Sequence, residues 1–298
     1  MLAFLNFLEV IWMTNTQFNY DDNYPGYKRV CLNETELAKF YTDHTIQGDF
    51  LENEYVILCD ENGQTLDLFK LQDGYFTHII NHPIRNTWSK EIKPRNIEQK
   101  LMFDALEDRT TPLKIFTGTY GSGKSFLTLN KALELIERGA FSKIIYLRNN
   151  INVKGTEAIG ALPGSIDDKQ LPWLLPIADI VGGPEGLQML LSSNELEAIP
   201  LGFIRGRSFN NAIIISDESE NLTKELYQLI IGRVGEGSEL WFLSDFRQTD
   251  YGANRYKVFT DGTPFMIDRL KGNRMVSVVN LPTTERSKVA NLSNLLDD

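Results

Sequence analysis

The stretch Gly118-Thr119-Tyr120-Gly121-Ser122-Gly123-Lys124-Ser125 decides the fold, because it matches the pattern G-x-x-x-x-G-K-[ST] at every fixed position. The apolar run 113–117 before it predicts a strand, and the segment 126–138 after it carries apolar residues at helical spacing. In a strand, loop and helix of this kind, backbone N–H groups and the helix N-terminus face a phosphate group. We therefore expect a nucleoside triphosphate to bind here.

The residue types in this loop indicate a separate role for each residue. Lys124 is expected to reach the β- and γ-phosphate oxygens, and the hydroxyl of Ser125 is expected to be a ligand for Mg²⁺. The glycines let the backbone curl around the phosphates. The predicted nucleotide-binding residues of the loop and first helical turn are Gly118, Thr119, Tyr120, Gly121, Ser122, Gly123, Lys124, Ser125 and Phe126.

Carboxylates and an amide follow two further predicted strands. The buried-strand pattern 212–216 ends in Asp217-Glu218, and this placement predicts that Asp217 holds the metal and Glu218 activates the attacking water as a general base. The run 239–243 is followed by Gln248, whose amide suits a sensor of the γ-phosphate. These residues complete a predicted hydrolytic site at the carboxyl ends of the strands.

The order of predicted elements gives the fold class. From residue 96 onward helices alternate with strands, which in combination with the phosphate loop predicts an α/β fold, a P-loop NTPase core with a parallel sheet sandwiched by helices. The expected helices are 97–107, 126–138, 185–193, 224–233 and 285–295. The expected strands are 113–117, 143–147, 198–204, 212–216, 240–243 and 275–279.

The N-terminal part has a different pattern. A short helix is expected over 34–40 and strands over 55–59, 66–71 and 75–80, which indicates a small α+β, mostly β, domain. We expect an N-terminal tail over 1–27, the small domain over 28–93 and the ATPase domain over 94–298, with Pro94 near the boundary.

Composition limits the functional classes. The formal charge is −10, of which residues 1–89 carry −8 and residues 90–298 carry −2, so a general affinity for nucleic acid is not expected, although local basic patches are. Cys31 and Cys59 are the only cysteines and are expected to be buried thiols in a reducing, cytoplasmic location. The apolar segment 1–12 contains Glu9 and is too short to span a bilayer, so no membrane association is expected.

Several motifs in a fixed order resemble those of PhoH-like proteins, a P-loop ATPase family related to superfamily 1 helicases. They are Pro94-Arg95-Asn96-Ile97-Glu98-Gln99, the phosphate loop, Gly160-Ala161-Leu162-Pro163-Gly164, Arg205-Gly206-Arg207-Ser208-Phe209-Asn210-Asn211, Asp217-Glu218, and Asp245 with Gln248. The segment 53–58 resembles the one that joins a PIN nuclease domain to the ATPase in longer members. Because few residues precede it here and no convincing set of acidic metal ligands is present among them, we do not expect an intact nuclease.

The resemblance implies further roles. Gln99 resembles the glutamine that reads adenine, which favours ATP over GTP, and Arg205 and Arg207 resemble paired arginines that act as a finger across a ring interface or contact a nucleic-acid backbone. Two residues depart from the family pattern. Glu220 replaces a glutamine that could couple nucleotide state to nucleic acid, and Tyr120 replaces a small residue.

Two functional hypotheses follow. In the first, the protein hydrolyses ATP with Mg²⁺ and uses the cycle on RNA or single-stranded DNA, as a homo-oligomeric ring such as a hexamer. In the second, ATP orders a surface for a protein partner without any work on nucleic acid, which the acidic N-terminal region and Glu220 favour.

Overall fold

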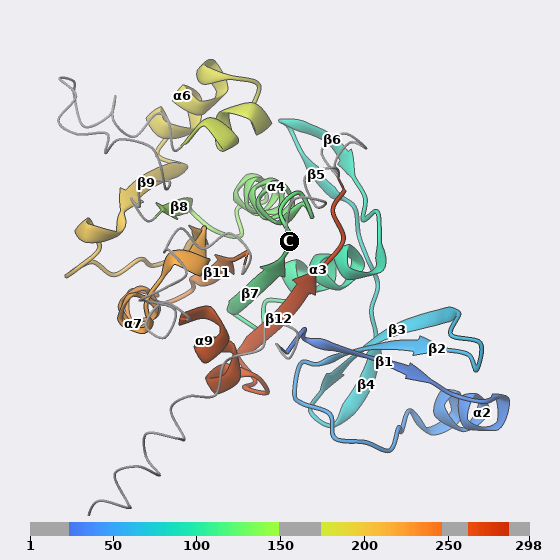
Figure 1. Ribbon diagram of the computed structural model, residues 1–298. Coiled ribbons are helices and arrows are strands. Elements are labelled where there is room, and N and C mark those ends of the chain that lie inside the picture. The colour runs from blue at the N-terminus through green and yellow to red at the C-terminus, as the bar shows by residue number, and fades with distance from the viewer. Residues whose placement is uncertain (1–23, 149–173, 246–261, 286–298) are drawn as a thin grey trace, which may run out of the picture.

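The computed structural model describes residues 24–148, 174–245 and 262–285 (Figure 1). Its centre is a six-stranded sheet in the order β12-β7-β11-β10-β8-β9, in which every neighbouring pair is parallel. The strands are β7 Leu113–Gly118, β8 Lys143–Arg148, β9 Leu196–Pro200, β10 Ala212–Asp217, β11 Glu239–Leu243 and β12 Val276–Leu281.

Helices cover both faces of this sheet, because its central strands are apolar on both sides (Figure 1). In β10, Ile213 and Ile215 pack in one cluster with α3, α4 and α6, whereas Ile214 packs on the other face with α7 and α9. The predicted α/β fold with a parallel sheet between helices is therefore confirmed. The helices are α3 Ile97–Glu107, α4 Lys124–Glu137, α6 Pro184–Ser192, α7 Lys224–Ile231 and α9 Gly262–Leu270, with short 3-10 turns η2 Leu201–Phe203 and η3 Ser219–Asn221.

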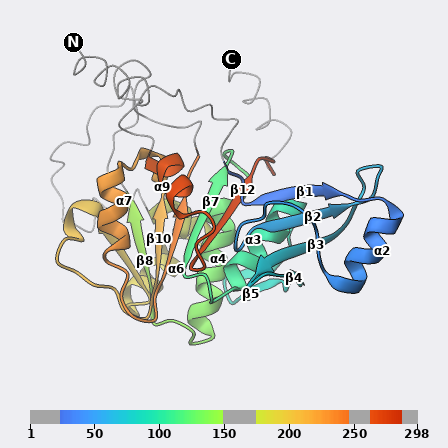
Figure 2. The same ribbon diagram turned by 90° about the horizontal axis from the view of Figure 1, so that it is seen from below.

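The N-terminal region forms a second, four-stranded sheet beside the core, as the prediction of a mostly β region required (Figure 2). Strand β1 pairs parallel to β2, and β2, β3 and β4 form an antiparallel meander. Helix α2 begins after Asn33, which forms a capping box with Glu36. The elements are β1 Tyr27–Cys31, α2 Glu34–Asp43, β2 Tyr55–Cys59, β3 Thr65–Gln72 and β4 Tyr75–His78.

Both faces of the N-terminal sheet are covered. Val56 and Leu58 point toward the side of α2 and pack with Phe40 in a separate small core. Tyr55 and Ile57, on the opposite face, belong to the same apolar cluster as residues of α3, α4 and β7. One face of the small sheet therefore shares its core with the larger one.

Buried polar contacts reinforce this junction. Lys70 of β3 forms an ion pair with Asp108 at the end of α3, and the Lys70 side chain is almost fully buried. The side-chain amide of Asn53 donates to three backbone carbonyls at the start of β12, those of Asn273, Arg274 and Val276, at 3.2, 3.0 and 3.2 Å. The N-terminal sheet thus fixes the positions of α3 and β12, two elements that reach the phosphate loop.

A β-hairpin that the sequence did not predict lies between β4 and α3 in the chain and packs beside α4 (Figure 1). Its strands are β5 Ile84–Asn86 and β6 Ser89–Ile92. The amide of Asn86 donates to the backbone carbonyl of Asn130 in α4, at 3.0 Å. The hairpin therefore packs along the helix that follows the phosphate loop and contributes a wall to the candidate site.

Two local predictions were wrong. Strand β9 ends at Pro200 and continues as the turn η2, whereas the sequence predicted a strand to residue 204. Cys31 is exposed at the end of β1, although Cys59 beside it on β2 is buried as expected. Within the described ranges, no helix combines the length and the apolar character that crossing a bilayer requires.

Candidate functional site

The phosphate loop connects β7 to α4 as the sequence predicted. Gly123 has φ of 97°, a left-handed conformation that favours glycine, and it leads directly into the first residue of α4, Lys124. The ammonium group of Lys124 donates to the carbonyl oxygens of Gly118 and Thr119, each at 2.8 Å. The lysine thus folds back over the loop, at the place where phosphate oxygens would be held.

The end of β12 and the segment that follows it form hydrogen bonds with the phosphate loop. The N–H of Thr119 donates to the carbonyl of Leu281 at 3.2 Å, and the N–H of Glu285 donates to the carbonyl of Gly121 at 2.9 Å. A Cβ atom at Gly118 would lie 2.1 Å from the Leu281 oxygen, and its φ of 129° is also in the region that favours glycine. Gly118 is therefore required for the close approach of β12.

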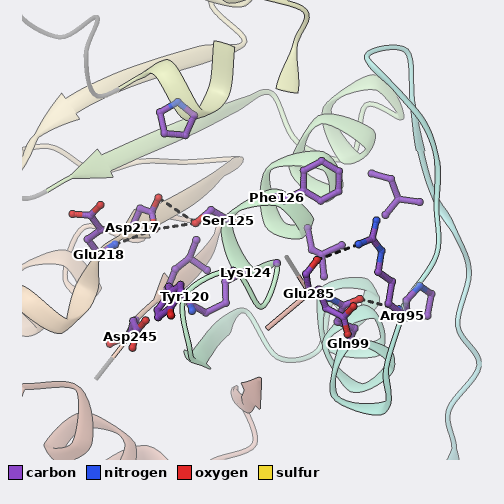
Figure 3. Close-up of a pocket in the computed structure, with 18 of the residues that line it drawn as sticks. Arg95, Gln99, Tyr120, Lys124, Ser125, Phe126, Asp217, Glu218, Asp245 and Glu285 are labelled. Carbon is purple, nitrogen blue, oxygen red and sulfur yellow. Dashed lines mark hydrogen bonds between the residues drawn. The ribbon is translucent and has the colours of Figure 1, made fainter. Parts of the chain in front are cut away.

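Asp217 ends β10 opposite the start of α4 (Figure 3). The hydroxyl of Ser125 lies 3.3 and 3.4 Å from its two carboxylate oxygens. The phenol of Tyr146, on the neighbouring strand β8, donates to Asp217 at 2.6 Å. Burial, together with this carboxylate, raises the pKa of Tyr146 well above its ordinary value, so the phenol remains a donor.

Glu218 follows in a left-handed backbone conformation, with φ of 52° and ψ of 46°. For a residue other than glycine this conformation costs on the order of 1 kcal/mol or more, and such strain is often found at functional positions. The backbone N–H of Glu218 donates to Asp217 at 3.0 Å, and its side chain forms an ion pair with Arg148 at the end of β8. The carboxylate is thereby held at the carboxyl edge of the sheet.

Glu220, in the turn η3 that follows β10, contacts the segment that follows β11. Its side chain, only 5% exposed, accepts a hydrogen bond from the backbone N–H of Asp245, just after β11, at 2.9 Å. Burial, with the nearby carboxylates of Glu218 and Asp217, raises the pKa of Glu220 to about 8, although the backbone hydrogen bonds act in the opposite direction. A protonated Glu220 at neutral pH resembles a glutamine in charge.

Lys124, Ser125, Asp217, Glu218 and Glu220 line a single cavity of about 980 Å³, a volume suited to a nucleotide (Figure 3). Its phosphate end is lined by Lys124, Ser125, Arg148, Asp217, Glu218, Glu220, Ser244 and Asp245. Its other end is lined by the segment 91–95, Gln99, Phe126, Leu127 and Glu285, whereas Tyr120 lies beside Lys124 and Asp245 (Figure 3). Gly121 and Gly123 lie between these two groups.

Gln99 lies at the N-terminus of α3, where its side chain is 3% exposed. Its amide oxygen accepts from the N–H of Arg95 at 2.9 Å, and its amide nitrogen donates to the carbonyl of Ser122 at 3.0 Å. Asn96 caps the same helix. The predicted adenine reader thus contacts the phosphate loop itself.

The sequence profile of the PhoH-like protein family matches residues 91–292, more than half of the chain. The chain belongs to the PhoH-like family. Protein PhoH2 of Bacillus subtilis is 29% identical over 293 residues, covering 92% of this chain and 64% of that protein. Protein PhoH2 of Thermobispora bispora is 34% identical over 212 residues, covering 70% of this chain and 48% of that protein, and a PhoH-like protein of Bacillus subtilis is 29% identical over 71% of this chain and 65% of that protein. The chain therefore spans between about half and two thirds of the length of these relatives.

Some predicted site residues of this PhoH-like chain lie away from the cavity. Arg205 is exposed on the connection between β9 and β10, and Arg207 pairs with Glu197 of β9 at 2.8 Å and lies over the ring of Phe209. Neither arginine is among the residues that line the cavity. Gln248, the predicted γ-phosphate sensor, and the motif 160–164 fall outside the described residues.

Sequence reasoning missed three contributors to the site. Tyr146 gave no signal except its place near the end of an apolar strand, and Arg148 follows the predicted strand 143–147 without a motif of its own. Glu285 was assigned to a helix, whereas it lies on the segment that braces the loop. Its contacts join residues more than 160 positions apart, which no local pattern predicts.

Proposed function

We propose that this PhoH-like protein binds ATP with Mg²⁺ and hydrolyses its terminal phosphoanhydride bond. The observation that carries the proposal is the convergence of Lys124, the Ser125–Asp217 pair and Glu218 on one cavity beside a complete phosphate loop. Family membership and the parallel-sheet fold support a nucleotide ligand in this cavity.

The donors present fit Mg²⁺. Ser125 and Asp217 offer hard oxygen atoms 3.3 Å apart, and among the described residues no group of three His, Cys, Asp or Glu side chains could enclose a metal alone. Mg²⁺ typically takes few protein oxygens and completes its shell with water and substrate phosphates. When bound, Mg²⁺ would neutralise charge on the phosphates. Tyr146 would hold the Asp217 carboxylate in a fixed orientation.

The remaining residues have roles that follow from their chemistry. Lys124 would exchange its carbonyl contacts for phosphate oxygens and offset their charge. Glu218 would orient a water molecule and accept its proton, once its carboxylate is turned from Arg148 toward the water. The cationic Arg148 would then lie near the reacting phosphate. Gln248 stays the predicted γ-phosphate sensor.

The partner of the ATP cycle is a separate part of the proposal. The family resemblance favours RNA or single-stranded DNA, with Arg205 and Arg207 at a subunit interface or on a phosphate backbone, in a homo-oligomeric ring. Arg205 is exposed and outside the cavity, which suits either use. The alternative is an ATP-controlled switch for a protein partner. It is supported by the acidic N-terminal region, in which residues 1–89 carry a net charge of −8.

The test is phosphate release from ATP with Mg²⁺, measured alone and with RNA, single-stranded DNA or duplex DNA, beside a mass measurement of the assembly. We expect Lys124→Ala to lose ATP binding or turnover, and Glu218→Gln to retain binding but slow hydrolysis by about 10². Normal hydrolysis by Glu218→Gln would show that Glu218 is not the base. An absence of nucleic-acid binding at low salt, with or without ATP, would favour the switch.

A further inference from the structure

The amide of Gln99 is engaged inside the protein. To read adenine, an amide must offer both its oxygen and its nitrogen to the base edge. Here the oxygen accepts from Arg95 N–H and the nitrogen donates to the carbonyl of Ser122, with the side chain 3% exposed. A Cβ atom at Gly123 would also lie 3.1 Å from the Gln99 nitrogen. Gln99 therefore links the phosphate loop to the N-terminal end of α3.

The end of the cavity away from Asp217 and Glu218 presents two flat side chains. Phe126, in the first turn of α4, lines the cavity and is 46% exposed, so one face of its ring is open to a ligand. Arg95 is also exposed there, and its guanidinium donates to the carbonyl of Glu285 at 3.3 Å. In Figure 3 both lie on the side of the phosphate loop opposite Asp217 and Glu218.

An aromatic ring and a guanidinium both bind the flat face of a nucleobase. Aromatic rings stack on bases, and arginine side chains add a cation–π component. The carboxylate of Glu285 is occupied on one oxygen, which accepts from the Asn96 amide at 2.6 Å. Glu91 and Lys93, which also line the cavity, pair with each other at 2.9 Å, so Phe126 and Arg95 are the groups at this end that suit the flat face of a base.

We infer that the base of the bound nucleotide stacks on Phe126 beside Arg95, and that Gln99 is a positioning residue of the phosphate loop, so that the site accepts purine nucleoside triphosphates with little discrimination between adenine and guanine. This inference rests on the proposed nucleotide site. Adenine and guanine share the two-ring face that stacks, whereas a pyrimidine offers a smaller one. We expect GTP to bind within about tenfold of ATP, the equivalent of one neutral hydrogen bond.

Binding measured by calorimetry, with Mg²⁺ present, tests the assignment of Phe126. The ligands are ATP, GTP and inorganic tripolyphosphate, which carries the phosphates without a base. Phe126→Ala should weaken ATP and GTP alike by about tenfold or more, the loss expected for one stacked base, and leave tripolyphosphate affinity within twofold. Phe126→Tyr keeps a ring and should retain binding. Phe203→Ala removes a ring that is 72% exposed on η2, outside the cavity, and serves as the matched control.

Gln99→Ala separates the two roles of the amide. A positioning residue predicts weaker binding of all three ligands, tripolyphosphate included, with the ratio of ATP to GTP affinity unchanged. An adenine reader predicts the opposite: unchanged tripolyphosphate affinity and a loss confined to ATP. The second result, or unchanged nucleotide binding in Phe126→Ala, would overturn the inference while leaving the phosphate site intact. If the native protein binds neither tripolyphosphate nor any nucleotide, the proposed function itself is wrong.

Discussion

The buried carboxyl group of Glu220 provides a quantitative test through the variant Glu220→Gln. The side chain is 5% exposed, and its pKa is raised from 4.5 to about 8, chiefly by burial. Gln is nearly isosteric and keeps an oxygen that can accept from the N–H of Asp245, the contact that Glu220 makes at 2.9 Å. The substitution therefore removes the titration with little change in packing.

The sign of the effect follows from proton binding. Between pH 4.5 and about 8 the folded protein keeps a proton on Glu220 that the unfolded chain has released, so this group lowers the free energy of unfolding as pH rises. The slope is about 1.4 kcal/mol per pH unit, or about 3 kcal/mol between pH 5 and 7. We expect the stability advantage of Glu220→Gln over the native chain to grow by about that amount over this range and to level off above pH 8.

Urea unfolding followed by tryptophan fluorescence, without Mg²⁺ and at several values from pH 5 to 8.5, measures this difference. Trp241, which is buried in β11, is a suitable reporter. Glu225→Gln, which alters an exposed carboxylate in the first turn of α7, is the matched control and should show a difference that does not vary with pH above 5. A difference for Glu220→Gln that stays flat from pH 5 to 8.5 would refute the reasoning.

Three other experiments test features elsewhere in the molecule. Tyr146→Phe removes the phenol that holds the candidate metal carboxylate, so the Mg²⁺ concentration for half-maximal phosphate release should rise about tenfold; an unchanged Mg²⁺ dependence would contradict its role. Lys70→Met leaves the carboxylate at the end of α3 without its buried partner and should lower the free energy of unfolding by about 3 kcal/mol, measured in urea, whereas a neutral result would show that the ion pair is dispensable. In a thiol titration with a coloured disulfide reagent, Cys31 should react rapidly in the folded protein and Cys59 only after unfolding, and two fast thiols would contradict the burial of β2.

The main elements of the core could be predicted because their signals are local. The octamer 118–125 identifies a loop by its own spacing, and the apolar run 212–216 is a strand that must be buried on both faces. Helix α3 has the bounds that its pattern predicted, 97–107. At such places the side-chain pattern and the tertiary environment require the same structure.

Elements that depend on distant partners were not predicted. The hairpin β5–β6 is short and polar, and its contacts with α4 involve a helix more than 30 residues away. Helix α9 begins with Gly-Thr-Pro, a sequence that is also typical of a turn, and it forms where Gly262 and Thr263 pack closely against Tyr227.

In the candidate site, too, residues with a local sequence signal were predicted, whereas contacts that depend on the fold were not. The sequence identified Lys124, Ser125, Asp217 and Glu218 by residue type and spacing, and the structure brings them to one cavity, although their roles stay predictions. The orientation of a single amide could not be predicted, because Gln99 has the same place in the chain whether it faces a base or the loop. The orientation of the amide depends on the backbone groups of Arg95 and Ser122, which come within hydrogen-bond distance only in the folded protein.

Strand β12 lies at an edge of the core sheet, yet its free side is covered, because the N–H of Asn280 donates to the carbonyl of Pro25 at 2.9 Å. Its first residue, Val276, accepts a hydrogen bond from Asn53 in the turn before β2 of the N-terminal sheet, and its last residue, Leu281, accepts one from Thr119 of the phosphate loop. A ligand that tightens the loop would then slow amide hydrogen exchange in the N-terminal sheet, far from the cavity. By the same coupling, deleting that sheet would weaken nucleotide binding without removing any residue that touches the ligand, so the N-terminal region is best regarded as part of one cooperative unit with the core.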